Sequence, residues 1–181
     1  RAFAMIPQLA CQAEDKMLKL NWYGDSEAKV AIGRRNAMKV TVSGNYPVSG
    51  DVAIGLELVK PADFTLALRI PEWSRNTSAT LISGADTIAV DLSARADGEY
   101  AKISRKWKPG DRIELSLDLT AHLLEQNGCQ AIVRGPLVLA RDSRFNDGFV
   151  DEGVVVQAAS DGTVELTPAE ADGFAWMAFT A

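Results

Sequence analysis

The chain has 181 residues, of which 47% are hydrophobic and 24% charged, and its net charge is −5. This composition is ordinary for a globular protein with a real core. A nucleic-acid surface needs clustered Lys and Arg, whereas "GRRN" at 33–36 is only a pair, and no apolar run approaches the roughly 20 residues of a membrane span. We therefore expect neither nucleic acid nor a membrane as a partner. Because the chain begins at Arg1 rather than Met, the lack of a leader leaves cytoplasm and periplasm both open.

The first fourteen residues have the period of a helix. Their apolar residues, spaced by three or four positions, are Phe3, Ile6, Leu9, Ala10 and Ala13. This spacing predicts an amphipathic helix over 1–14, kinked or interrupted near Pro7 because proline disrupts a helix interior. We expect it to be the end of a helix that starts before Arg1.

From Lys16 onward the period changes to two, which is typical of half-buried antiparallel strands. The clearest segments are "MKVTV", "VAIGLELV", "FTLALRI" and "RIELSLDL". The residues expected to face inward are Met38, Val40, Val42, Val52, Ile54, Leu56, Leu58, Phe64, Leu66, Leu68, Ile70, Ile113, Leu115, Leu117 and Leu119. Turn sequences separate the strands, and "KPGD" at 108–111 has the pattern of a type II turn. The fold class predicted is all-β, an antiparallel β-sandwich.

The sequence also suggests how the chain is divided. We expect a β-sandwich over 15–118 and a second, smaller β region over 119–181, either separate or merged with the first. In "CQAIVRG" and "PLVLAR" consecutive residues are apolar, which predicts a central strand covered on both faces.

Residues with metal-binding or nucleophilic chemistry are few and scattered. His122, the only histidine, has no nucleophile motif beside it, and a structural role is expected. Cys11 and Cys129 do not form the short-range ligand spacing of a zinc site, so we expect two buried free thiols. The segment "DSRFNDGFVDEG" contains Asp142, Asp147, Asp151 and Glu152 but lacks the ligand order of an EF-hand; a solvated acidic loop is expected, with a bound cation as the alternative.

Sugar contacts have one candidate pair in the sequence. Glu72 directly precedes Trp73, an aromatic residue able to stack on a sugar ring. The structural alternative is that Pro71 ends the strand and Trp73 folds back over the end of the sandwich. The other large aromatics, Trp22, Tyr23, Trp107 and Trp176, lie in or beside strand patterns and are expected in the core. "NTS" at 76–78 fits the N-glycosylation pattern, which is common by chance.

Four motifs carry a family resemblance, in this order along the chain: "NYPVSGDVAIGLEL", "LALRIPEW", "GEYAKISRKWKPGDRIELSL" and "AIVRGPLVLA". They resemble the C-terminal half of glycoside hydrolase family 127, the bacterial β-L-arabinofuranosidase-like enzymes, from residue 1 to about 140. The resemblance implies an (α/α)6 barrel that carries the active site, followed by jelly-roll-like β-sandwich domains. Residues 1–14 would then be the last barrel helix, and Arg69 and Arg134 would meet acidic groups or carbonyls at a domain junction.

The resemblance also implies where the chemistry lies. The family's nucleophile is a cysteine within a zinc site of cysteines and a glutamate, upstream of the last barrel helix. Cys11 and Cys129 do not match that motif, so no catalytic, cofactor or metal residue is carried over to this chain, and any zinc ligands would lie outside it. The expected function is a non-catalytic accessory region whose partner is the upstream barrel of the same polypeptide.

Two other functions stay open. The chain could be an independent carbohydrate-binding module for arabinose-containing glycans, which requires an exposed aromatic platform. It could also be a structural or interaction domain, with an apolar patch on the N-terminal helix that supports a homodimer. The family's longer members continue past the position of Ala181, so the second β region is expected to be truncated or a short variant.

Overall fold

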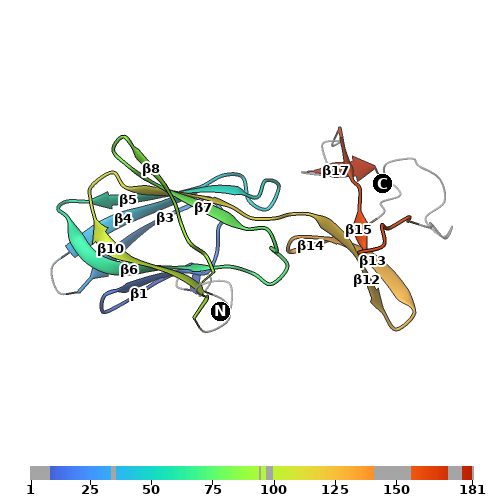
Figure 1. Ribbon diagram of the computed structural model, residues 1–181, viewed down its shortest axis with the longest axis horizontal. Coiled ribbons are helices and arrows are strands. Elements are labelled where there is room, and N and C mark those ends of the chain that lie inside the picture. Colours follow the sequence, from blue (N-terminus) through green and yellow to red (C-terminus); the bar gives the residue numbers. More distant parts are fainter. Residues whose placement is uncertain are drawn as a thin grey trace. The chain divides into compact units, whose positions relative to one another are not determined.

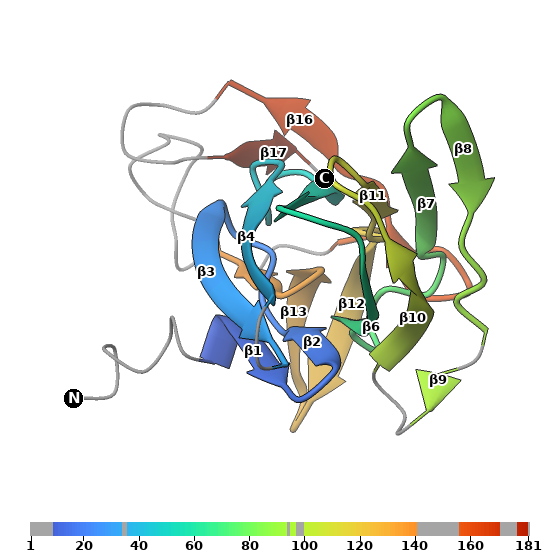
Figure 2. The ribbon, with the colours of Figure 1, turned by 90° about the vertical axis from the view of Figure 1, so that its left-hand side faces the viewer.

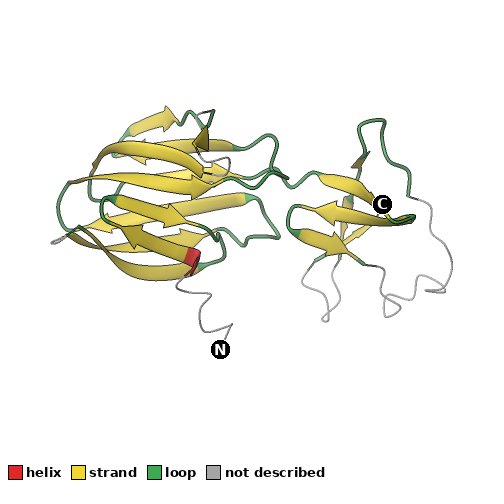
Figure 3. Ribbon diagram, turned by 90° about the horizontal axis from the view of Figure 1, so that it is seen from below, coloured by secondary structure: helices red, strands yellow, loops and turns green. Residues whose placement is uncertain are grey.

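The computed structural model describes residues 9–33, 36–93, 95–96, 100–140, 156–170 and 177–180. It divides the chain into two compact units, Arg1–Asp118 and Leu119–Ala181. The regular structure of the described residues consists of strands, apart from residues 9–10, which are helical (Figure 3). No helix in this part of the chain is long and apolar enough to cross a membrane. The predicted all-β fold class is confirmed.

The first unit is a sandwich of two sheets (Figure 1). In spatial order, one sheet contains β1 (Cys11–Glu14), β2 (Met17–Leu20), β6 (Ala62–Arg69), β10 (Tyr100–Trp107) and β9 (Arg95–Ala96). The other contains β3 (Ser26–Ile32), β4 (Asn36–Ser43), β5 (Asp51–Leu58), β11 (Arg112–Ser116), β7 (Ser78–Ser83) and β8 (Asp86–Ala89). Within these sheets β2 and β6 pair in parallel, and the other pairs are antiparallel. Figure 2 shows the β7–β8 hairpin that ends the second sheet.

The core lies between these two sheets, and the two-residue period produces it. β5 alternates buried and more exposed side chains along its length, as does β11, because successive side chains of a strand point to opposite faces. Of the residues expected to face inward, all are buried except Leu119. That residue follows the end of β11 and belongs to the second unit. Tyr23 and Trp107 are buried as predicted.

The turn at "KPGD" is also confirmed. Gly110 has φ +85°, the positive value that a type II turn requires at its third position. The main-chain N–H of Asp111 donates to the carbonyl of Lys108 at 3.1 Å. The Asp111 carboxylate in turn accepts the Lys108 N–H at 2.9 Å. Two hydrogen bonds between Lys108 and Asp111 therefore close the connection between β10 and β11.

The prediction of an N-terminal helix over 1–14 is wrong for its last four residues. Cys11–Glu14 form strand β1, which pairs antiparallel with β2, so that Cys11 lies opposite Leu20. Asp15 adopts φ +47° in the intervening turn, and the resulting hairpin satisfies the main-chain groups that a helix would otherwise pair. The rest of the predicted helix, residues 1–8, lies outside the described residues, and with it most of the expected dimer contact.

The second unit has a sheet in the order β14 (Leu137–Leu139), β13 (Cys129–Arg134), β12 (Ala121–Gln126) and β15 (Thr163–Val164). A separate pair is formed by β16 (Thr167–Ala169) and β17 (Ala178–Thr180). Asn127 and Gly128, both with positive φ, join β12 to β13, as in type I′ hairpins.

β13 is an inner strand of its sheet, as predicted. Its side chains are exposed or half-buried, so the predicted coverage of both faces is wrong. The apolar run is divided at Gly135 (φ +56°) into two strands, and the second, β14, lies at the sheet edge. Val138 of β14 is 66% exposed.

Candidate functional site

The predicted sugar-contacting pair lies just after β6, where Pro71 follows Ile70. The two residues differ in exposure: Glu72 is exposed, whereas Trp73 is half-buried and packs against the core of the first unit. The N–H of Ser74 donates to the carbonyl of Pro71 at 3.0 Å and closes a turn around them. This arrangement matches the structural alternative for Trp73 and leaves Glu72 accessible.

A polar network fixes the chain immediately after this pair. The buried Ser74 hydroxyl shares a 2.6 Å hydrogen bond with Thr77 Oγ1 and accepts the Asp118 N–H at 2.7 Å. Asn76 donates its Nδ2 hydrogen to Asp118 Oδ2 at 3.0 Å. The asparagine of the "NTS" pattern therefore has its amide nitrogen engaged, and the network ties the turn after β6 to the end of the first unit.

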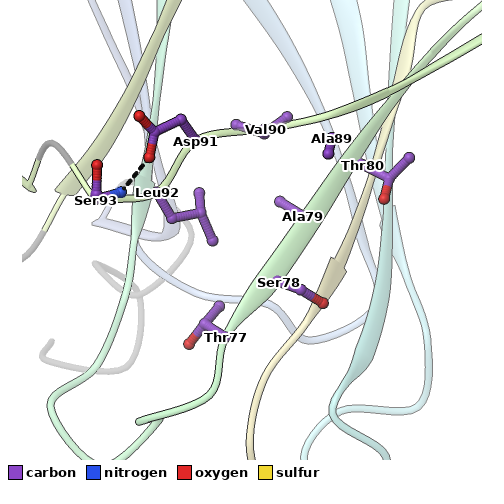
Figure 4. Close-up of a pocket in the computed structure, with 9 residues that line it drawn as sticks. All are labelled: Thr77, Ser78, Ala79, Thr80, Ala89, Val90, Asp91, Leu92 and Ser93. Atoms are coloured by element: carbon purple, nitrogen blue, oxygen red, sulfur yellow. Dashed lines mark hydrogen bonds between the residues drawn. The ribbon is translucent and has the colours of Figure 1, made fainter.

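An open groove of about 600 Å³ lies beside the same turn (Figure 4). It is lined by Thr77, Ser78, Ala79, Thr80, Ala89, Val90, Asp91, Leu92 and Ser93. Asp91 Oδ1 accepts the Ser93 N–H at 2.8 Å, and hydrogen bonds from Ser93 hold the pKa of the Asp91 carboxyl below its usual value. Glycoside hydrolysis ordinarily uses two facing carboxylates, and this lining supplies one. The groove offers hydroxyl and carboxylate hydrogen bonding, without the pair of acids for bond cleavage.

The two thiols are free, but the expectation that both are buried is wrong. Cys129, which follows the Asn127–Gly128 turn, is exposed, and Cys11 on β1 is half-buried. Burial raises the pKa of the Cys11 thiol. The part of the chain that the structure describes contains no group of three or more His, Cys, Asp or Glu side chains close enough to hold a metal.

His122 is half-buried in β12, opposite Thr163 of β15. Hydrogen bonds from Thr163 lower the pKa of Asp161, with a smaller contribution from the charge of His122. The acidic loop with Asp142, Asp147, Asp151 and Glu152 lies outside the described residues, as does Trp176.

Trp22 differs from the prediction made for it. It was expected in the core, but it is 47% exposed. Its ring lies edge to face with that of Tyr46, with centroids 5.6 Å apart. Strand β2 ends at Leu20, so the two-residue alternation no longer determines which side Trp22 faces. Exposure of an aromatic ring in a connecting segment depends on the tertiary structure.

The two arginines highlighted by the sequence have different surroundings. The main-chain oxygen of Arg69 accepts a 2.7 Å hydrogen bond from the buried Tyr23 hydroxyl, and its side chain is exposed. The Arg134 guanidinium lies 5.0 Å from the ring centroid of Phe179 within the second unit, a cation–π distance. Burial lowers the pKa of Arg134. The sequence did not indicate this aromatic contact, because Phe179 lies 45 residues further along the chain.

Comparison with known proteins gives the class and then the family. The family model described as the β-L-arabinofuranosidase GH127 middle domain matches residues 17–119. This range contains β2 to β11. The fold and the family match together place the chain in the class of accessory β-sandwich domains of glycoside hydrolases. The chain belongs to the GH127 β-L-arabinofuranosidase family, which confirms the resemblance found in the sequence.

Solved structures agree with this assignment. The chain is similar to a GH127 β-L-arabinofuranosidase of Geobacillus stearothermophilus T6, with 27% identity and a TM-score of 0.67 over 75% of this chain and 22% of that one. A protein described as a glycoside hydrolase gives 27% identity and 0.66 over 76% and 23%. A further GH127 β-arabinofuranosidase gives 25% and 0.60 over 74% and 24%. The chain thus spans less than a quarter of the length of these relatives. No curated protein matches it.

Proposed function

We propose that this chain is a non-catalytic β-sandwich region that supports the catalytic domain of a β-L-arabinofuranosidase-like enzyme. The observation that carries the proposal is the match of residues 17–119 to a domain described as the middle domain of such enzymes. A middle domain has neighbours in its polypeptide, so the natural partner is an upstream catalytic domain of the same chain.

The architecture of the first unit suits a supporting role. Its core is one continuous cluster with side chains from both sheets, and close-packed interiors of this kind resist deformation. The groove beside β7 contributes a single carboxylate. The match covers only 22–24% of the length of the solved relatives, so catalytic residues have ample room in the remaining three quarters of such a polypeptide.

The test is an activity assay on an aryl β-L-arabinofuranoside. It compares the 181-residue chain with the polypeptide that also contains the upstream domain. We expect turnover by the longer protein and none by the chain alone. Turnover by the purified chain that is lost on Asp91→Asn would overturn the proposal, because it would place a catalytic acid in the groove.

Carbohydrate binding through Glu72 and Trp73 is a second candidate function, favoured by the exposure of Glu72 beside an aromatic ring. Calorimetry with arabinose-containing oligosaccharides tests it directly. Glu72→Gln keeps the shape of the side chain and removes its charge, so it is expected to weaken binding at this site severalfold. The matched control is Glu57→Gln on the exposed face of β5. No heat of binding with the unmodified chain would reject this candidate.

A further inference from the structure

We propose that the groove between β7 and residues 89–93 is a binding site for a neutral saccharide, distinct from the pair of Glu72 and Trp73. Its volume of about 600 Å³ lies within the range of roughly 300–1,000 Å³ that is usual for small-molecule sites. The inference rests on the proposed function for the source of the ligand. It adds a place on the sandwich where a glycan would be held without being cleaved.

The groove forms because two neighbouring segments of the chain separate. The β7–β8 ladder ends at Thr80 opposite Ala89, and one more hydrogen bond follows it, from the Val90 N–H to the Ala79 carbonyl at 2.9 Å. Figure 4 shows the chain leaving β7 beyond Val90. Residues of both segments line the groove, so the space between them is open to a ligand.

Both walls of the groove are anchored in the sandwich. On one side β7 also pairs with β11, so that Ala79 lies opposite Leu115. On the other side Leu92 is 9% exposed and belongs to the core cluster, and Val90 packs against that cluster. Walls that are already fixed reduce the conformational entropy that is lost when a ligand binds.

The lining carries hydrogen-bonding groups on both walls. Ser78 and Thr80 lie on the same face of β7, because they are two residues apart, and each hydroxyl can donate and accept. On the other wall Asp91 is exposed, and its Oδ1 accepts the Ser93 N–H at 2.8 Å. A carboxylate has about four acceptor positions. Those that Ser93 does not occupy are available to ligand hydroxyls.

These groups define the class of ligand. An ionised carboxylate only accepts hydrogen bonds, so the ligand must donate them, as sugar hydroxyls do. Among the described residues that line the groove there is no Lys or Arg. A phosphate, sulfate or uronic acid group would therefore meet the charge of Asp91 without a cationic partner.

A cation and a cleavage reaction fit this lining less well than a bound sugar. Ca²⁺ takes about six to eight oxygen ligands, and glycoside hydrolysis ordinarily uses two carboxylates, whereas the described lining supplies one carboxylate. A neutral saccharide can donate to Asp91, exchange hydrogen bonds with the β7 hydroxyls and place its C–H groups against Ala89 and Val90. The site is thus equipped to hold a sugar.

The test is an NMR titration of the ¹⁵N-labelled 181-residue chain with a neutral arabinose trisaccharide. The groove is open and has no aromatic ring among its described lining residues, so a dissociation constant on the order of 1 mM is expected. Saturable shifts should appear at the amide signals of residues 77–80 and 89–93. Their absence at about twenty times that concentration would overturn the inference.

Two variants and a control locate the binding. Asp91→Asn keeps the shape of the side chain and removes its charge, and it should weaken binding about fivefold because charge-assisted hydrogen bonds are stronger than neutral ones. Ala89→Trp fills the groove from an exposed position and should abolish the shifts at residues 77–80. Asp86→Asn, also exposed on β8 but outside the lining, should bind as the unmodified chain does. Equal affinity of Asp91→Asn and the unmodified chain would contradict the assigned contact.

The same titration separates the inference from its competitors. Shifts centred on residues 72–74 would favour the second candidate function and overturn the groove. Tighter binding of an oligosaccharide with uronic acid groups, or of a short extended peptide, would overturn the neutral-saccharide class. Cleavage of the trisaccharide by the chain, with the groove shifts retained, would overturn the proposed function and leave the groove standing. An inactive chain without groove shifts would overturn the groove alone.

Discussion

The indole N–H of Trp107 donates a 3.0 Å hydrogen bond to the main-chain oxygen of Phe64, and the two rings stack with centroids 5.5 Å apart. Trp107 closes β10 and is fully buried, and Phe64 lies on the neighbouring β6. A buried indole needs a partner for its N–H, and this one finds it on the adjacent strand. The pair therefore contributes both a hydrogen bond and ring packing to the first sheet.

Replacing Trp107 by Phe should lower the free energy of unfolding by about 2–4 kcal/mol, because the variant loses the hydrogen bond and leaves a cavity. Urea unfolding followed by circular dichroism measures the change. Trp22→Phe is the matched control. Because the ring at that position is half-exposed, this substitution should lower the free energy of unfolding by less than about 1 kcal/mol. Equal losses in the two variants would contradict the assigned burial.

The Asp111 carboxylate provides a second stability test. It is 1% exposed, accepts the Lys108 N–H, and lies 3.6 Å from the Arg105 guanidinium. Asp111→Ala should cost about 2–4 kcal/mol in chemical unfolding, because it leaves a buried donor and a cation without their partner. The exposed pair of Arg112 and Glu114, 3.3 Å apart, supplies the control, and Glu114→Ala should change stability by less than about 0.5 kcal/mol. A neutral Asp111→Ala would show that the turn closes without this carboxylate.

Tyr23 should make the chain less stable at high pH. Burial, and then the neighbouring Tyr46 and Tyr100, raise the pKa of its hydroxyl above the ordinary value of 10.0, with Arg69 acting in the opposite sense. In the unfolded chain the hydroxyl ionises near pH 10 while the folded chain retains its proton. The stabilisation from this group is therefore complete below pH 10 and is lost as the pH rises further, at up to about 1.4 kcal/mol per pH unit.

Tyr23→Phe keeps the ring and removes the titrating group. Unfolding measured from pH 8 to 11.5 should show a shallower fall in stability for this variant than for the unmodified chain above pH 10. Below pH 9 the variant should be less stable by about 1–2 kcal/mol, since the hydrogen bond to the Arg69 carbonyl is lost. Parallel curves over the whole range would refute the role of this hydroxyl.

The two cysteines should differ in reactivity. Cys129 is exposed, whereas Cys11 is half-buried with a raised thiol pKa, and the thiolate is the reacting form. Reaction with a disulfide reagent at pH 8 should label Cys129 first and Cys11 more slowly by about tenfold or more. Cys129→Ser should remove the fast phase alone. Loss of the slow phase in that variant would reverse the assignment.

The division at Asp118 predicts that the first unit folds by itself. Its sheets and core are complete within residues 9–118, and Ser74 and Asn76 hold Asp118 at its end. A fragment that stops at Asp118 should unfold cooperatively, with a midpoint within about 5 °C of that of the same unit in the full chain, as small single domains do. Calorimetry of both proteins measures this, and a fragment without a transition would mean that the sandwich requires the second unit.

The sequence predicted most where local rules suffice. Two-residue alternation identified the inward faces of β4, β5, β6 and β11 because a strand with one buried face must place apolar side chains at every second position. The sequence-based prediction failed at Cys11–Glu14, where three- and four-residue spacing indicated a helix but the segment pairs with β2 as a strand. The spacing of Leu9, Ala10 and Ala13 contains no information about a partner strand, and main-chain pairing decided the outcome.

The candidate site shows the same limit. Glu72 and Trp73 were found from chemistry and adjacency, and the half-burial of Trp73 matches the structural alternative, whereas the half-exposure of Trp22 reverses what its position suggested. Both residues lie just outside strands, where periodicity no longer fixes the direction of a side chain.

The amino-acid sequence by itself determined the all-β class, the inward faces of the main strands, the turn at Gly110 and the family, since each depends on residue type and short spacing. Only the tertiary structure decided the parallel pairing of β2 with β6, the contact of Arg134 with Phe179 and the contact of the half-exposed Trp22 with Tyr46. Those features join residues far apart in the chain, and their energies arise from contacts that exist only after the sheets have formed.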